Sequence, residues 1–402
     1  MPIRAQVCTW IATVGLLAPS MAAAQDRTER ELVDLIVRDG PLAQAIRADT
    51  EVTRRAQLAR LAYPNPSVTY SREGAGFTEF FQAEQSLPIF GVRAALSRAG
   101  VAASAAAEAE RDVRLWRLRS DAAVAVARVV AEQAREEAAR TQVREVERLI
   151  EIVRIREREG EGSRFDRLRA EQELRDTNQL VTTAVVALTE VRTVLAGMLP
   201  RDVAIARIAA AEMSQAAVPV ETLLARATST RADLRALQQL GARAALEAEV
   251  ARRSRLPTPT LFGGVKRADD ASGRETGGVF GISVALPLFD TGGRDRARWD
   301  AEGARVEAER AAIEYRIRSD INGASEVLAV RQAALTQEPP GAADELVQIA
   351  EVAYREGEVG ILELLDAVRT AARARNRAIE LRLDTRLAQI ALERAVGDTL
   401  WP

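Results

Sequence analysis

Apolar side chains recur every three or four residues over most of the chain, which is the pattern of long helices packed along a seam. Between residues 92 and 159 there is no proline, and the apolar positions step by alternating threes and fours. This spacing is typical of a coiled coil, and a helix over these residues would be about 100 Å long at about 1.5 Å per residue. After a glycine-containing turn, a second helix is predicted to return to about residue 197. The two would form a helical hairpin far longer than a globular core requires.

Two shorter stretches alternate apolar and polar residues, which predicts strands with one apolar face. The first stretch covers about 66–87 and the second about 258–287, and each is expected to fold into a β-hairpin. In the second stretch a polar, glycine-rich loop is expected at 267–278. The residues predicted to make the apolar face are Phe81 in the first stretch and Phe280, Ile282 and Val284 in the second.

Three landmarks occur twice, at a nearly constant separation. An Arg-Glu-Gly-Glu tetrapeptide at 158–161 returns at 355–358, each time where one helical stretch stops and another begins. Both strand stretches follow a proline-containing break, and both close on a Leu-Pro segment that ends in Phe, at 87–90 and 286–289. Landmarks that recur in the same order indicate two copies of one structural unit.

The sequence therefore predicts a mainly α fold with a small β part, made of two tandem repeats that each hold a strand hairpin and a long coiled-coil helical hairpin. The first repeat is predicted at 25–215, with strands at about 66–87, helices at about 92–197 and a tip at 158–163. The second is predicted at 216–402, with strands at about 258–287, helices at about 293–396 and a tip at 355–360.

Residues 1–24 have the pattern of a secretory signal peptide. Arg4 gives the positive start, residues 10–17 the apolar run, and residues 22–24 the small-residue cleavage site. The run is shorter than the roughly 20 residues needed to span a bilayer, although an uncleaved N-terminal anchor is the alternative. The chain is expected to be exported, and no later segment is expected to be a membrane-spanning helix.

The composition excludes several kinds of chemistry. The 402 residues include no His, and the one Cys, Cys8, lies within the predicted signal peptide. A mature protein without thiol or imidazole has no thiol catalysis, disulfides, His general bases or usual zinc ligands. We therefore predict no enzyme activity, no metal site and no cofactor. The net charge of −2 argues against nucleic acid as a partner.

The strands of an exported chain raise the question of what covers their apolar face. A sheet with open edges cannot lie in a bilayer, because each unpaired backbone group costs several kcal/mol in hydrocarbon. Four strands per chain are too few to close, since membrane barrels begin at about eight strands. An oligomeric barrel with the long helices projecting as a tube is one solution. The alternative is a soluble periplasmic coiled-coil scaffold or adaptor without a pore.

Four motifs follow one another along the chain. They are Tyr-Pro-Asn-Pro at 63–66, Thr-Arg-Ala-Asp-Leu-Arg-Ala-Leu at 230–237, Leu-Pro-Leu-Phe-Asp-Thr-Gly-Gly-Arg at 286–294, and Tyr-Arg-Glu-Gly at 354–357 with Leu-Leu-Asp at 364–366. In this order they resemble the TolC family of outer-membrane efflux channels over nearly the whole mature chain, although the family often has Arg-Pro-Asp-Leu where Ala232 stands here. The Leu-Pro-Leu-Phe segments resemble those of the heavy-metal-efflux branch as well as drug-efflux ones, which leaves the transported substrate open.

The resemblance implies a homotrimer in the outer membrane of a Gram-negative bacterium. Four strands from each chain would join a 12-stranded β-barrel, and the helices would form a tunnel in the periplasm. The expected function is a passive exit duct of a tripartite efflux system. Its expected partners are a periplasmic adaptor (membrane fusion) protein and an inner-membrane efflux pump, and Phe81, Phe280, Ile282 and Val284 would face outer-membrane lipid.

In that family the periplasmic tips form the adaptor contact and the closed end of the tunnel. Counting from the tip glycines, the resemblance implies that the gate is formed by Asp166, Tyr354, Glu363 and Asp366. The residues expected to make the tip turns, and to contact the adaptor, are Gly160, Gly162, Ser163, Gly357 and Gly360. The basic residue expected two positions after the second tip glycine is replaced by Val359, so Arg164, Arg167 or Arg355 would have to substitute for it.

A trimer would bring Glu363 and Asp366 of three chains into one narrow ring. A ring of acids at a constriction favours cations and repels anions within a Debye length of about 8 Å. The alternative is that these two acids are ordinary solvated residues beside a heptad seam, as most acids on such helices are.

Overall fold

The chain is mainly helical, with one four-stranded sheet. The computed structural model describes residues 25–74, 78–210, 218–270, 273–289, 291–337 and 341–401, so the predicted signal peptide lies outside the described residues. The helices are α1 (Glu29–Asp39), α2 (Pro41–Arg60), α3 (Val92–Glu159), α4 (Arg164–Ala196), α5 (Val220–Thr230), α6 (Ala232–Arg253), α7 (Gly293–Thr336), α8 (Ala342–Arg355) and α9 (Ile361–Val396). The strands are β1 (Gln25–Thr28), β2 (Ser67–Glu73), β3 (Thr78–Ser86), β4 (Ile205–Ala209), β5 (Pro259–Asp270) and β6 (Gly273–Val284).

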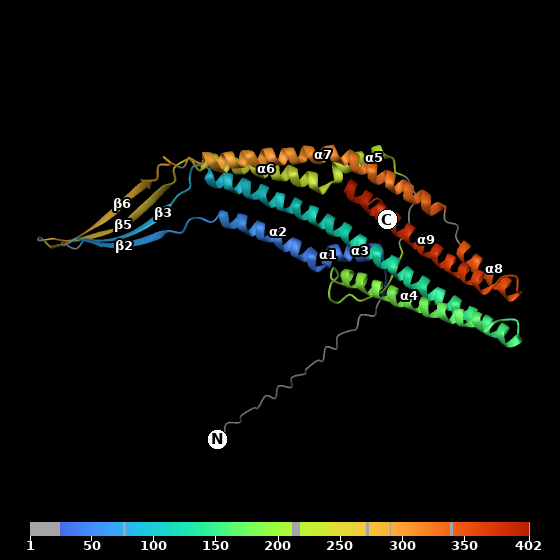
Figure 1. Cartoon of the computed structure of the whole chain (residues 1–402). Coiled ribbons are helices and arrows are strands. Elements are labelled where there is room, and N and C mark those ends of the chain that lie inside the picture. Colours follow the sequence, from blue (N-terminus) through green and yellow to red (C-terminus); the bar gives the residue numbers. More distant parts are fainter. Residues whose placement is uncertain are drawn as a thin grey trace, which may run out of the picture.

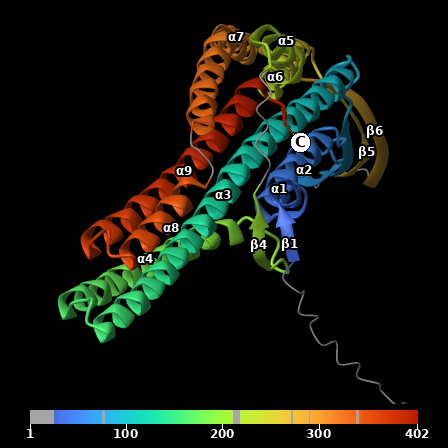
Figure 2. The ribbon, with the colours of Figure 1, turned by 90° about the vertical axis from the view of Figure 1, so that its right-hand side faces the viewer.

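The molecule is elongated, with the sheet at one end and two helical tips at the other (Figure 1). Helix α3 runs the whole way from the sheet to the first tip as one element of 68 residues, as the absence of proline between 92 and 159 predicts. Near the tips the hairpin of α8 and α9 lies beside the hairpin of α3 and α4 (Figure 2). The two halves of the chain are thus neighbours along the whole length.

The sheet is antiparallel with the strand order β2-β3-β5-β6. The central pairing, between β3 and β5, joins the hairpins of the two repeats into one sheet. The prediction of a loop at 267–278 was wrong, because β5 and β6 remain paired as far as Asp270 and Gly273. Strand pairing is made by backbone groups, so it continues through polar and glycine-rich residues once the register is set.

A short parallel pair, β1 with β4, was not predicted from the sequence. It joins Gln25 to Ile205 and Thr28 to Ala209, residues that are far apart in the sequence. Segments this short carry no periodic pattern of their own, so only the three-dimensional neighbourhood shows that they pair.

Among the described residues, the core is a series of helix-to-helix seams that includes three apolar clusters. One lies where α1, α3, α4 and α9 meet, one at the tips, and one between α5, α7 and α9. Alanine dominates the buried face of α3, with Ala99, Ala103 and Ala106 fully buried. Small side chains let neighbouring helices approach closely.

Candidate functional site

One face of the sheet carries exposed apolar side chains on every strand, and we call it the apolar face. The register places Phe81 of β3 opposite Tyr70 of β2 and Val265 of β5. Phe280 is 90% exposed and Ile282 is 68% exposed. A contiguous apolar patch of this kind marks a contact with protein or membrane. The exposed large apolar residues on it are Val68, Tyr70, Phe81, Leu261, Val265, Phe280, Ile282 and Val284, which include all four residues predicted to face lipid.

The opposite face of the sheet, which we call the polar face, is lined mainly by hydrogen-bonding groups. Gln82 Nε2 donates to Glu84 at 2.6 Å, and the hydroxyl oxygens of Ser86 and Thr260 are 3.1 Å apart. The Lys266 ammonium lies 5.4 Å from the centre of the Phe80 ring, which is on the same face. Within the described residues β2 and β6 each pair with a single strand. The sheet therefore has a polar face, an apolar face and two edges that no described strand pairs.

Each helical tip turns on a glycine with positive φ. Gly160 ends α3 at φ 82° and Gly357 follows α8 at φ 81°. Only glycine adopts this backbone conformation without strain. After the first turn Ser163 starts α4, where its hydroxyl accepts from the Asp166 backbone N–H at 3.1 Å. The Asp166 carboxylate in turn accepts from the Ser163 backbone N–H at 3.3 Å, so these two residues form a helix capping box.

The two tips enclose a cleft of about 340 Å³ that contains three of the four predicted gate residues, Asp166, Tyr354 and Glu363. Tyr354 is only 3% exposed. Burial, and then the charge of Asp166, raise the pKa of the Tyr354 phenol above its usual value. The phenol is therefore neutral at physiological pH and can act as a hydrogen-bond donor.

Arg156 is a cleft residue that the sequence reasoning missed. Its guanidinium donates to the backbone carbonyl of Tyr354 and lies 4.9 Å from the centre of the Tyr354 ring. Val359, at the position of the expected basic residue, packs against the apolar cluster of the tips. Arg167, one of the proposed substitutes, is engaged by Glu157 at 2.7 Å and by Glu171 at 3.0 Å. Arg156 thus brings positive charge to the cleft from α3.

Asp366 does not line the cleft with the other three predicted gate residues. Its side chain is 76% exposed, and the Arg373 guanidinium is 3.7 Å from its carboxylate. One helical turn separates it from Glu363, which does line the cleft. In a single chain the four predicted residues are therefore three cleft residues and one solvent-exposed acid.

Among the described residues, two inter-repeat ion pairs with nearly buried glutamates hold the tip hairpins together above the cleft, and neither was predicted. Arg369 of α9 donates to Glu173 of α4, with 2.9 Å between Nε and Oε1. Arg375 of α9 donates to Glu145 of α3 at 2.6 Å and to Asp344 of α8 at 2.7 Å. The two glutamates are nearly buried, at 6% and 4% exposure, and each ion pair raises the pKa of its arginine. We call these pairs the hairpin clasp.

Helix α4 is unusual in its apolar surface. It is long and apolar enough to cross a membrane, although no segment after the signal peptide was predicted to do so, and only 11% of its most apolar window is buried. Exposed on it are Leu180, Val185, Val186 and Val194. Length and composition alone do not place a helix in a bilayer, because helices that pack against protein share them. The exposed apolar side chains do indicate that one face of α4 contacts another apolar surface.

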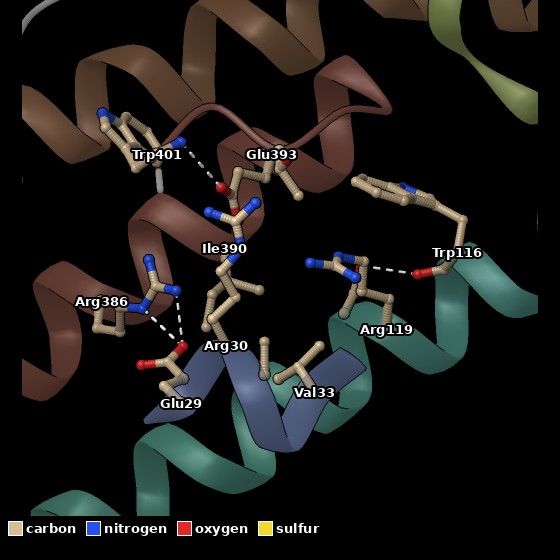
Figure 3. Close-up of a pocket in the computed structure, with 12 residues that line it drawn as sticks. Glu29, Arg30, Val33, Trp116, Arg119, Arg386, Ile390, Glu393 and Trp401 are labelled. Carbon is tan, nitrogen blue, oxygen red and sulfur yellow. Dashed lines mark hydrogen bonds and ion pairs between the residues drawn. The ribbon is translucent and has the colours of Figure 1, made fainter. Parts of the chain in front are cut away.

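A small cavity lies where α1, α3 and α9 meet (Figure 3). Arg386 of α9 donates to Glu29 of α1 at 2.6 Å, and Arg119 of α3 donates to Asp34 of α1 at 2.6 Å. At about 60 Å³ the cavity has room for about two waters. The cavity lies at a junction where ion pairs join α1 to α9 and to α3. Among the described residues, no three His, Cys, Asp or Glu side chains come together in a way that could hold a metal ion.

Comparisons with known proteins agree with this architecture. Residues 223–398 match the family described as outer membrane efflux protein. A search of the curated proteins finds no match.

Several solved structures share the fold over most of the chain. The MtrE outer membrane channel of Neisseria gonorrhoeae, in its open state, has a TM-score of 0.72 at 20% identity, with 93% of this chain and 90% of that chain covered. The outer membrane protein VceC of Vibrio cholerae has a TM-score of 0.67 at 18% identity, covering 92% and 96%. The CmeC outer membrane channel of Campylobacter jejuni has a TM-score of 0.67 at 12% identity, covering 99% and 93%.

Proposed function

We propose that the chain is the exit duct of a tripartite efflux system, because residues 223–398 match the outer membrane efflux protein family and the fold is shared with solved outer-membrane channels. It lies in the outer membrane and extends into the periplasm. It conducts substrates passively from an inner-membrane pump and a periplasmic adaptor to the exterior. Residues 1–24 serve as the signal peptide, and 25–215 and 216–402 are the two repeats.

The sheet is the observation that carries this proposal. It has an apolar face with Phe280 90% exposed, a polar face, and two open edges in one chain. Burying such a sheet in lipid requires every edge to be paired. Three copies arranged edge to edge give twelve strands, which is enough for a closed barrel. The apolar face then meets lipid and the polar face lines the channel.

The helical part supports the same assembly. The exposed apolar side chains of α4 have no cover among the described residues, and α8 carries Ile349 and Val352 exposed near the same end. In a closed ring of three chains these helices face one another across the chain boundaries. We therefore propose a homotrimer in which α4 packs against a neighbouring chain rather than against lipid.

The tips are the proposed gate and adaptor contact. The cleft between them holds Asp166, Tyr354 and Glu363, and its rim carries the exposed apolar residues Phe165 and Leu362. Exposed apolar groups beside acids suit a partner that presents both apolar and basic side chains. An adaptor seated on the tip turns could separate the hairpins and so open the tunnel.

The gate assignment makes a prediction about ion block. If Glu363 and Asp366 of three chains line the constriction, replacing both with Ala should weaken the block of the channel by multivalent cations in planar bilayers. The reason is that the negative potential at the pore would be lost. The matched control is Glu380→Ala, an exposed acid further along α9, which should leave the block unchanged. Equal block in all three proteins would remove Glu363 and Asp366 from the gate.

Membrane fractionation tests the proposed function against a soluble periplasmic scaffold. The duct should remain in the outer-membrane fraction and should require detergent for extraction. Chemical crosslinking of the extract should give a species of three chains. Recovery of the protein in the soluble periplasmic fraction as a monomer would contradict the proposal and favour the scaffold.

A further inference from the structure

Phe262 is one of two phenylalanines on the polar face of the sheet, where most side chains are polar or small; the other is Phe80, which contacts Lys266. Phe262 lies on β5, and the register pairs it with Glu84 of β3 on one side and Gly281 of β6 on the other. Alternation along the strands places all three on the polar face. In the proposed barrel this face surrounds the channel, so the position of the phenyl ring decides how much of the lumen it fills.

The ring lies along the sheet and ends over Gly281. A Cβ added at Gly281 would be 2.5 Å from Cζ of Phe262, 3.0 Å from Cε1 and 3.1 Å from Cε2. These three atoms are the far end of the ring, so the ring reaches across from β5 and occupies the space where a side chain at 281 would stand. A carbon–carbon separation of 2.5 Å is far inside van der Waals contact, for which the optimum is about 3.5–4.0 Å. Any side chain at 281 must therefore displace the ring.

Another glycine on the same strand provides a natural comparison. Gly277 is on β6, four residues away and on the same face, and a Cβ added there would meet nothing within 4 Å. The glycine at 281 is thus required by its neighbour, whereas the one at 277 is not. The space over Gly281 is reserved for the ring of Phe262.

We propose that Gly281 holds the Phe262 ring flat against the barrel wall and so sets the free width of the lumen at this level. A ring displaced from Gly281 is blocked by the backbone of β6 beneath it, and the open direction is toward the lumen. In a trimer, three displaced Phe262 rings, one from each chain, would project into the lumen at the same level of the barrel. The inference rests on the proposed function, because it needs the polar face to line the channel.

The contact also has a purely structural reading, in which an aromatic ring covers a glycine on a neighbouring strand and thereby stabilises the sheet. The two readings differ in what a double substitution does. If the ring matters only as a cover, then Gly281→Ala with Phe262→Ala should be the least stable protein and should show no change in lumen width. If the ring is held out of the lumen, the same double substitution should restore the width that Gly281→Ala takes away.

The lumen width can be measured from outside the cell with a single engineered thiol. Ser283 is on the polar face, two residues beyond Gly281 toward the helices, so a reagent entering from the hairpin ends must pass Phe262 to reach it. Because Cys8 falls within the predicted signal peptide, Ser283→Cys supplies the one thiol of the mature chain. Its modification rate is measured on whole cells with a small methanethiosulfonate and with a bulky polymer-linked maleimide.

In the Ser283→Cys background, Gly281→Ala should slow the bulky reagent several-fold and leave the small reagent nearly unchanged. Adding Phe262→Ala should restore the bulky rate, and Gly277→Ala should not alter it. If Gly281→Ala fails to assemble, Phe262→Trp serves instead, since the longer indole also overruns Gly281 and should slow the bulky reagent.

An unchanged bulky rate in Gly281→Ala and in Phe262→Trp, or slowing that persists in the Gly281→Ala, Phe262→Ala protein, would overturn the inference while leaving the duct intact. If neither reagent modifies Ser283→Cys from outside in the parent background, the polar face does not line an open lumen. In that case the proposed barrel itself fails.

Discussion

Replacing Arg375 with Met is expected to loosen the tip hairpins more than any other single change in the helical part. Arg375 joins three helices through Glu145 and Asp344, and Glu145 is only 4% exposed. Removing the arginine leaves a nearly buried carboxylate without its cation, which typically costs about 3–5 kcal/mol. The expected results are a lower unfolding temperature of the detergent-extracted protein and a larger leak current through the channel.

Arg373 provides the matched control for Arg375, because it lies on the same helix two residues away. Its side chain is 70% exposed and stands 3.7 Å from Asp366, and exposed pairs of this kind contribute about 0–1 kcal/mol. Arg373→Met should therefore resemble the parent protein. Adding Glu145→Leu to Arg375→Met removes the stranded charge and should recover most of the lost stability. Equal behaviour of Arg375→Met and Arg373→Met would show that the hairpin clasp is not needed.

Phe280→Arg is expected to prevent stable assembly in the outer membrane. Phe280 is 90% exposed on the apolar face near the middle of β6. An arginine facing lipid at mid-bilayer costs about 2–4 kcal/mol in a barrel of this kind, and a trimer bears that cost in each of its chains. The expected result is loss of the heat-stable trimer from the outer-membrane fraction, seen by electrophoresis of samples that have not been heated.

Val279→Arg tests whether this effect depends on the face of the sheet. Val279 precedes Phe280 and lies on the polar face, where an arginine would enter the aqueous lumen. Assembly should therefore survive Val279→Arg, with an altered ion selectivity of the channel. If both substitutions abolish the trimer, or neither does, the two faces of the sheet do not divide lipid from water as proposed.

The long elements could be predicted because their sequence signal extends over many helical turns. No proline occurs between Val92 and Glu159, and the apolar seam of α3 resumes after an interruption at residues 132–136. The structure gives the helix the bounds Val92–Glu159. The apolar face of the sheet could also be predicted from strict alternation in β6. The outer parts of β5 and β6 could not, because their polar, glycine-rich residues resemble a loop, and only the backbone ladder between Asp270 and Gly273 shows that they pair.

The tips show where sequence reasoning reached its limit. Counting from the two tip glycines selected Asp166, Tyr354 and Glu363, and the fold does bring these three to one cleft; their role in gating stays a prediction. Arg156 and the Glu173–Arg369 pair were missed because they depend on how two helices are rotated and staggered against each other. Periodicity along one helix says which residues face a partner, but it does not say which residue of the partner they meet.

The central claim is that three copies of this chain close into a conducting channel. The most direct measurement is single-channel recording of the detergent-extracted protein in a planar bilayer, on the same sample that crosslinks as three chains. The account predicts discrete, uniform current steps, larger in Arg375→Met than in the parent and absent in Phe280→Arg. A crosslinked trimer that inserts into the bilayer and carries no current in either the parent or Arg375→Met would contradict it.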